Sequence, residues 1–474
     1  MKKNYFLAIA VAALLLAATV AQAADVTFGG QIRPRFNIDN DSSDTSSPNT
    51  FFDTRVRLNA KANVNANTAV FLQFQSVGNW GADGGGQTHN GTRLAIGGGG
   101  EEANDNLSDV GFHQAYLTLK NFAGYAADLK VGRQEIVVDG HRLFGHTGWT
   151  QGAQTSDAIR LTHAAGNHTL NYTYIAAEEQ DSITTTARQD ANVHFLHAQT
   201  QGIMGGTLTG IFTITDDHAG NSSAAFEDHE VWYTIGARQK GKLSGLDYRV
   251  EYYHQFGDAG NIASDCACAI TGATETGDSV DRNAHMFGLR VGKTFKNAAW
   301  SPTLTLWFDS LSGTDDDDAS GGEFGTFDVM YDTGHKFYGL MDFYLNRAGS
   351  TTGYYGLEDY ALKFKGTPKA GWTVKADFHH FRTQTEISGG DANTVIATDA
   401  TLGGAMDEDL GTEIDLTLAH KYDANTTIAL GYSHYFTTST FGMLNGGAAG
   451  SGGTAGSNNN DDADWTYLQI DTKF

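Results

Sequence analysis

Hydrophobic and polar residues alternate along most of the chain after its first two dozen residues. Between residues 25 and 37, the apolar residues Val26, Phe28 and Ile32 occupy even-numbered positions, and Arg33 and Arg35 occupy odd-numbered positions. Successive side chains of a strand point to opposite faces, so a period of two predicts a strand with one apolar face. The same pattern predicts strands at 25–37, 51–64, 68–79, 111–121, 126–137, 154–165, 167–177, 190–202, 205–216, 229–241, 244–256, 283–296, 301–311, 354–366, 371–384, 410–422, 425–437 and 463–474.

The lengths of the connections give the architecture. Alternate connections are very short, as at 65–67 and 423–424, and the others are long and rich in Gly, Asp, Asn and Ser. Short turns alternating with long loops, around an even number of strands, are typical of bacterial outer-membrane barrels. A further apolar stretch, 336–345, also looks like a strand, but the alternation holds only if it lies within one long loop, 312–353. We therefore expect an all-β fold, a single transmembrane antiparallel β-barrel of about 18 strands over residues 24–474, in which loop 312–353 has the length to fold into the lumen.

The first 23 residues have the features of a secretory signal peptide. Two lysines precede an apolar stretch that runs from Tyr5 to about Val20, and Ala21-Gln22-Ala23 provides a small-x-small cleavage site. We expect cleavage after Ala23 and export to the outer membrane of a Gram-negative bacterium; an uncleaved membrane anchor is the alternative. The last predicted strand ends in Phe474, as the closing strands of outer-membrane barrels do.

Composition supports a large β structure and excludes several classes of protein. The chain has 58 Gly but only 4 Pro, which suits one large antiparallel structure better than a string of linked domains. A net charge of −24 argues against a nucleic-acid partner, because phosphate binding needs basic surfaces. Two cysteines exclude a disulfide scaffold. A soluble secreted β-sandwich remains an alternative, but it would not explain the short and long connections.

Most of the excess acid lies in the long loops, whereas the strands are slightly basic. A charged side chain that faces lipid at mid-depth costs about 2–4 kcal/mol, so the basic residues of the strands should face the lumen. The predicted lumen residues from this argument are Arg33, Arg35, Arg55, Arg57, Arg160, Arg238, Arg249, Arg290, Lys363 and Lys375. A basic lumen favours anions. In the alternative interpretation, carboxylates on the same faces, such as Glu251, Asp377, Glu413 and Asp415, neutralise these residues.

One stretch resembles a known family. It comprises Lys130–Ile136, Asp139-Gly140, Arg142-Leu143, Gly145, Trp149 and Asp157–Leu161. This stretch is similar to the alginate export family of outer-membrane β-barrel porins, and 335–342 and 410–415 also look similar. The resemblance implies an 18-stranded barrel, a narrow arginine-lined lumen, and passage of anionic polyuronate or, in broader members, other small solutes. It also implies that Arg133, Glu135, Arg142, Asp157 and Arg160 are pore residues. The family often has Arg and Phe where this chain has Gln154 and Ser156.

The sequence gives only weak signals for catalysis, disulfide formation or cation binding. No spacing assembles Ser, His and a carboxylate for nucleophilic catalysis, so we expect neither an enzyme nor a bound cofactor. Cys266 and Cys268 could form a loop disulfide or stay as free thiols. The acidic runs Asp315–Asp318 and Asn458–Asp462 could bind Ca²⁺ or Mg²⁺, or remain solvated.

The sequence therefore predicts a passive outer-membrane channel for small or polymeric, anionic, hydrophilic solutes. Its partners would be the lipid bilayer and such solutes; the sequence leaves open whether it is a monomer or a trimer. The alternative is a surface interaction protein, in which the barrel anchors acidic loops for adhesion, cation binding or a redox partner.

Overall fold

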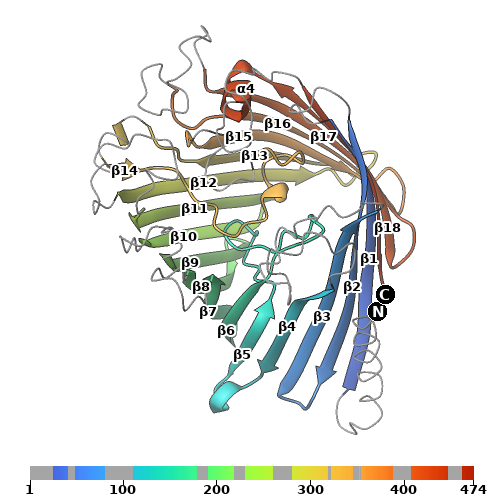
Figure 1. Ribbon diagram of the computed structural model, residues 1–474, viewed down its shortest axis with the longest axis vertical. Coiled ribbons are helices and arrows are strands. Elements are labelled where there is room, and N and C mark those ends of the chain that lie inside the picture. Colours follow the sequence, from blue (N-terminus) through green and yellow to red (C-terminus); the bar gives the residue numbers. More distant parts are fainter. Residues whose placement is uncertain are drawn as a thin grey trace, which may run out of the picture.

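The alternating segments pair in chain order and form one closed ring of antiparallel strands (Figure 1). The computed structural model describes residues 25–40, 48–80, 110–178, 191–217, 230–259, 280–315, 317–318, 322–344, 352, 354–387, 407–446 and 462–474. Among these residues, eighteen strands make the wall, which confirms the predicted count.

The wall strands have the following bounds: β1 Asp25–Asn40, β2 Asn49–Asn63, β3 Thr68–Asn79, β4 Gly111–Leu119, β5 Ala127–Gln134, β6 Ser156–Ala165, β7 His168–Glu178, β8 Ala191–Ile203, β9 Gly206–Asp217, β10 Glu230–Leu243, β11 Leu246–Asp258, β12 Asp281–Thr294, β13 Thr303–Leu311, β15 Leu357–Gly366, β16 Trp372–Arg382, β17 Asp409–Lys421, β18 Thr426–Thr437 and β19 Ala463–Lys473. Short elements lie between them: β14 Glu323–Phe324, the 3₁₀ helices η1 Phe122–Gly124 and η3 Gly334–Lys336, and α4 Ser439–Gly446.

The first and last strands close the ring. β1 pairs with β19 in antiparallel register, with Gln31 opposite Lys473. The main chains of Gly30 and Phe474 exchange two hydrogen bonds, of 2.8 and 3.1 Å. The described start of the chain, β1, and its last residue, Phe474, are therefore neighbours in the wall. Closure leaves the wall without an open edge, which a sheet within hydrocarbon requires.

The apolar stretch at 336–345 is not a wall strand. β13 pairs directly with β15, and the two-residue β14 only adds a short parallel pairing to β12. Lys336 instead ends η3, and residues 337–344 follow it inside the ring of strands.

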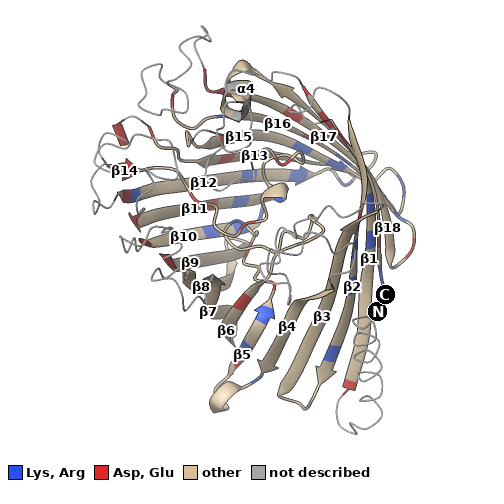
Figure 2. Ribbon diagram, in the orientation of Figure 1, with Lys and Arg blue, Asp and Glu red and all other residues tan. Residues whose placement is uncertain are grey.

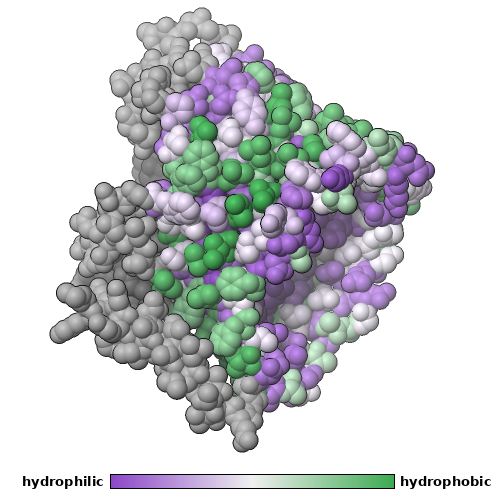
Figure 3. Space-filling view, turned by 90° about the vertical axis from the view of Figure 1, so that its right-hand side faces the viewer, coloured by the Kyte–Doolittle hydropathy of each residue, from purple (hydrophilic) through white to green (hydrophobic). Residues whose placement is uncertain are grey.

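Alternation places apolar residues on the outside of the ring and polar residues on the inside. On the outer face, Phe28 is 59% exposed and Leu58 is 51% exposed, whereas Arg33 and Arg55 on the inner face are buried. Figure 3 shows hydrophobic residues in broad patches on one side of the molecule. Acidic residues stand at the loop ends of β10, β11 and β12, where Arg282 follows Asp281, and the other basic residues of these strands lie farther along them (Figure 2).

Several strands are shorter than the pattern predicts, and the difference at β5 is informative. We expected a strand over 126–137, but β5 ends at Gln134. The next apolar residues, Ile136 and Val138, are 4% and 6% exposed and belong to a hydrophobic cluster inside the ring. Their hydrophobicity reflects burial in the lumen instead of contact with lipid.

Several sequence predictions lie outside the described residues. They include the signal peptide at 1–23, both cysteines and most of the long acidic loops. Among the described residues, no helix has the length and apolar character to cross a membrane.

The assignment of the two faces can be tested on β8. Leu196 is 47% exposed on the outer face, and Gln199 lies on the inner face three residues away. Leu196→Arg should lower the free energy of unfolding from lipid vesicles by about 2–4 kcal/mol, because it places a charge in hydrocarbon. Gln199→Arg should change it little. Equal losses in denaturant titrations of the two variants would contradict the assignment.

Candidate functional site

Two segments leave the wall and fold into the ring of strands (Figure 1). The first inward segment, residues 135–155, connects β5 to β6, and the second inward segment, residues 325–344, lies between β14 and β15. Each packs apolar side chains on the inner wall. Phe144 lies on Phe195 of β8 with ring centroids 4.5 Å apart, and Tyr344 lies on Phe381 of β16 at 4.6 Å.

The two inward segments bind each other across the lumen. Gly145 N donates to Tyr331 O at 2.7 Å, and Tyr331 N donates to Leu143 O at 2.9 Å. Gly145 is required at this crossing, because a Cβ there would lie only 2.1 Å from Thr333 Oγ1. We call the paired segments the crossbar.

Arginines of β1 and β2 clamp one end of the crossbar. Arg33 donates from Nη1 and Nη2 to carbonyl oxygens within residues 148–150 at 2.7–2.9 Å. Arg35 and Arg55 donate to carbonyl oxygens of the same segment, at 2.7 and 3.1 Å. Carbonyl groups accept hydrogen bonds but carry no net charge. In the described part of the chain, no carboxylate lies within 4 Å of these three guanidinium groups, so no close ion pair neutralises them.

An ion-pair cluster anchors the other side of the first inward segment. Arg142, which is 1% exposed, lies 2.5 Å from Asp309 Oδ2 and 3.2 Å from Glu251 Oε1. Burial acts to lower the pKa of Arg142, but Asp309, Tyr338 and Glu251 together raise it well above its ordinary value. Arg142 therefore stays charged within the protein.

Three further arginines predicted to line the pore share these two carboxylates. Arg238 and Arg249 lie 3.4 and 3.5 Å from the oxygens of Glu251. Arg290 lies 3.4 Å from Asp309. With Arg142, four arginines surround two carboxylates, so this part of the lumen is partly neutralised and keeps a positive excess.

The remaining predicted pore residues are paired or lie apart. Arg133 forms an ion pair with Asp157 at 2.5 Å, and Arg160 donates to Asn171 at 3.3 Å. Lys363 lies 3.1 Å from Asp377. Lys375 is exposed on the lumen face of β16, in register with Lys365.

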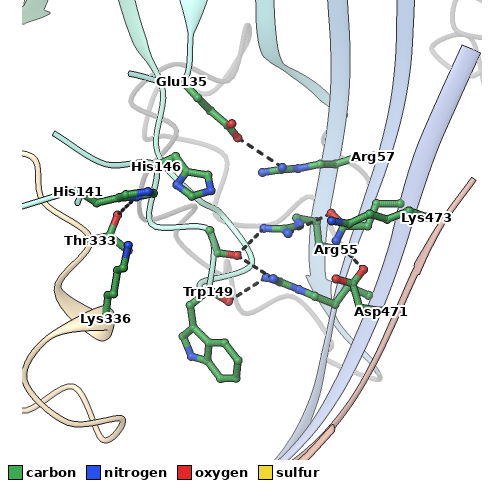
Figure 4. Close-up of a pocket in the computed structure, with 13 residues that line it drawn as sticks. Arg55, Arg57, Glu135, His141, His146, Trp149, Thr333, Lys336, Asp471 and Lys473 are labelled. Atoms are coloured by element: carbon green, nitrogen blue, oxygen red, sulfur yellow. Dashed lines mark hydrogen bonds and ion pairs between the residues drawn. The ribbon is translucent and has the colours of Figure 1, made fainter. Parts of the chain in front are cut away.

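A cavity of about 500 Å³ lies between the crossbar and the wall (Figure 4). The wall contributes Gln31, Arg33, Arg55, Arg57, Asp471 and Lys473, and the crossbar contributes Glu135, His141, His146, Gly148, Trp149, Thr333 and Lys336. Five cationic and two anionic side chains therefore line it. The carboxylates are engaged: Glu135 lies 3.0 Å from His113 Nε2 and 3.5 Å from Arg57, and Asp471 accepts from Gln31 at 2.6 Å.

The surroundings of the cavity also lower the pKa values of three crossbar residues. Burial, together with Arg249, Arg238 and Arg142, lowers the pKa of Lys336 to about 8. Burial, Lys336 and His146 lower the pKa of His141 to about 4. Burial lowers the pKa of His146. Both histidines are therefore neutral near pH 7, and the positive charge of the cavity comes from Arg and Lys alone.

Trp149 narrows the space between the crossbar and the wall. The Arg35 guanidinium lies 3.9 Å from the centroid of the indole, and the His335 ring stacks on it at 4.4 Å with an interplanar angle of 3°. Two groups this close to one centroid cannot share a face, so the indole lies between them. This stack joins β1 to the second inward segment through the first.

Sequence reasoning missed several lining residues. Lys473 and Asp471 follow the same alternation as the predicted arginines, on the inner face of β19, and the pattern could have found them. His141, His146, Thr333 and Lys336 lie on segments without periodicity. Only the crossing of the two inward segments brings them into the cavity.

Comparisons with known proteins agree with this architecture. The profile of the Alginate export family matches residues 24–449. The chain belongs to the alginate export family. No curated protein matches the chain.

Solved structures share the fold at low sequence identity. The Pseudomonas aeruginosa protein OccD3 (OpdP) is 11% identical, with a TM-score of 0.51 over 95% of this chain and 91% of its own. Pseudomonas aeruginosa OpdK, solved with vanillate, is 10% identical, with a TM-score of 0.52 over 95% and 98%. Pseudomonas aeruginosa OpdL is 10% identical, with a TM-score of 0.54 over 95% and 99%.

Family and fold together define the general role. This member of the family is an outer-membrane channel of the porin type, which lies in a lipid bilayer and lets solutes pass. They point to a transporter and not to an enzyme. Within the described ranges, no three His, Cys, Asp or Glu side chains gather in a way that could hold a metal ion.

The Trp149 stack predicts a change in conductance. Trp149→Ala should raise the single-channel conductance in a planar bilayer, because it removes the indole between Arg35 and His335. Trp80 on the outer face, stacked on Phe52 at 5.1 Å, provides the control. Trp80→Ala should leave conductance unchanged. Unaltered conductance of the Trp149 variant would show that solutes take another route.

Proposed function

We propose that this channel passes anionic hydrophilic solutes, both small ones and thin polymeric ones. The observation that carries the proposal is the way the arginines are partnered. Arg33, Arg35 and Arg55 donate to neutral oxygens and keep their charges, whereas a carboxylate partner would have cancelled them. Low-dielectric walls focus the field of such charges into the aqueous space and raise the local concentration of anions.

The geometry of the lumen supports the same proposal. The crossbar fills the middle of the ring, and the cavity beside it has more cationic than anionic lining residues. Entry into a narrow basic space is favourable for anions and unfavourable for cations of similar size. The solved relative OpdK, which holds vanillate, shares only the fold, and vanillate is a carboxylate.

Two parts of the proposal extend to residues outside the described ranges. Export to the outer membrane would use residues 1–23 as a cleaved signal peptide. The acidic external loops could bind Ca²⁺ or Mg²⁺, but transport itself would need no cofactor.

The charge selectivity of the purified protein tests the proposal. In a planar bilayer with a KCl gradient, the reversal potential should show that chloride is more permeant than potassium. In liposomes, glucuronate should enter faster than glucose, which has a similar size and no charge. A cation-selective channel would overturn the proposal, and bilayers that stay silent over several preparations would remove the channel function itself.

A further inference from the structure

Arg57 differs from the other arginines of the cavity, because it lies beside a carboxylate. Its Nη1 is 3.5 Å from Glu135 Oε1. Arg33 and Arg55 donate instead to carbonyl oxygens of the first inward segment, and in the described part of the chain no carboxylate lies within 4 Å of their guanidinium groups. The charge of one cavity arginine is therefore offset locally, whereas the charges of the other two are not.

Glu135 stands where the chain turns from the wall into the lumen. β5 ends at Gln134, and Glu135 is the first residue of the first inward segment. Its main-chain N–H donates to Gln114 Oε1 of β4 at 3.2 Å, which ties this point of the chain to the wall. Its side chain is 23% exposed and lines the cavity (Figure 4). The carboxylate is therefore in contact with the space through which a solute would pass.

His113 of β4 holds this carboxylate in place. His113 is 0% exposed, and its Nε2 lies 3.0 Å from Glu135 Oε1 and 2.9 Å from Arg57 Nη2. A guanidinium only donates and a carboxylate only accepts, so Nε2 can serve one of the two partners. Among the described residues, the buried Nδ1 has no hydrogen-bond partner, and a proton there would lack an acceptor. The proton therefore belongs on Nε2, which donates to Glu135.

These contacts keep Glu135 ionised. Burial acts to raise the pKa of Glu135, but the hydrogen bond from His113 and the charge of Arg57 outweigh burial and lower this pKa below its ordinary value. Glu135 consequently carries its negative charge at neutral pH. Its field also reaches His141 on the same inward segment, where it opposes the groups that lower the pKa of that histidine.

We propose that Glu135 limits the anion preference of the channel by neutralising Arg57, and that His113 is the positioning residue that keeps the carboxylate there. Glu135 is then a residue that determines charge selectivity, because removing its charge would expose Arg57 to the cavity and strengthen the field that attracts anions. This inference rests on the proposed passage of anions and names the carboxylate that moderates it.

Reversal potentials in a KCl gradient test the role of Glu135. Glu135→Gln keeps the size of the side chain and removes its charge. It should raise the permeability ratio of chloride to potassium by about two- to fivefold, as expected for the loss of one partly exposed ion-pair partner. Glu135→Asp keeps the charge and should leave the ratio close to that of the unaltered channel.

The control variant is Asp128→Asn. Asp128 is an exposed residue of the same strand, β5, seven residues before Glu135. At the rise of a strand it lies about 20 Å away, and charges beyond about 10 Å are largely screened in 0.1 M salt. This variant should change the ratio little. A ratio that stays constant in Glu135→Gln, or that rises equally in Asp128→Asn, would overturn the inference.

The pH dependence of selectivity tests the positioning role of His113. In the unaltered channel, the chloride to potassium ratio should rise as pH falls through the lowered pKa of Glu135, because the carboxylate then loses its charge. Glu135→Gln should lack this step. His113→Leu removes the hydrogen-bond donor, so the pKa of Glu135 should rise and the step should move to higher pH. A step at the same pH in His113→Leu would overturn the positioning role, which a packing role alone would not require.

The groups that surround Glu135 determine where this step lies. The charged and titratable ones are Arg55 and Arg57 on β2, His113 and Tyr116 on β4, Lys130 on β5, and His141 and His146 on the first inward segment. In the described ranges, His113 and Arg57 are the members of this set that lie within 4 Å of the carboxylate. The step therefore reports chiefly on these two residues.

The outcomes separate the two proposals. An anion-selective channel whose ratio does not respond to Glu135→Gln would overturn this inference and leave the proposed function in place. A channel that prefers potassium, but in which Glu135→Gln moves the ratio toward chloride by the expected factor, would support the role of Glu135 and overturn anion preference as the function.

Discussion

Every backbone N–H and C=O in a bilayer must have a partner, because hydrocarbon offers none. In this chain the requirement is met by the pairing of β1 with β19, which turns an open sheet into a ring. Closure fixes two faces for each strand, and the period of two then assigns every wall residue to lipid or lumen. The basic residues of the strands consequently collect inside the ring.

Inside the ring, a similar requirement applies to charged side chains, which must find partners in a crowded lumen. The chain meets it in two ways. Near β1 and β2, arginines donate to neutral carbonyl oxygens of the first inward segment. Near β11 and β13, arginines converge on Glu251 and Asp309. Both arrangements hold the crossbar, but among the described residues only the first holds it without a carboxylate within 4 Å of its guanidinium groups.

The strands and their orientation could be predicted from the sequence, because a local period of two determines both. Arg33, Arg35, Arg55 and Arg57 were placed in the lumen on that basis. The alternative interpretation, in which carboxylates neutralise the basic residues of the lumen, also has support from the structure, since Glu251 and Asp309 share four arginines. The choice between these interpretations depended on partners distant in the sequence, which alternation does not reveal.

The length of loop 312–353 allowed it to fold into the lumen, but the contacts that build the crossbar could not be predicted, because its segments have no period. Residues 336–345 have the apolar character of a strand, but Phe337 and Tyr338 belong to the lumen core, where aromatic packing and not lipid contact selects them. Arg142 was identified only by resemblance to a family. Lys336 lies in the stretch 335–342 that resembles the family, but its place in the cavity could not be read from the sequence, since it depends on hydrogen bonds between residues 141–145 and 331–333.

The division of roles among the cations bears on how a channel conducts. A solute must be attracted strongly enough to enter and held weakly enough to leave. Free arginines at every position would chelate carboxylates through paired N–H donors, and such contacts are strong. Here the guanidinium donors are used by the protein, so attraction acts through the field. The exposed ammonium groups of Lys336 and Lys473 also line the cavity, and an ammonium lacks the fixed geometry of a guanidinium. Fixing the arginines to the crossbar therefore stabilises the constriction, and it leaves few paired donors that could trap the anions that we propose the channel passes.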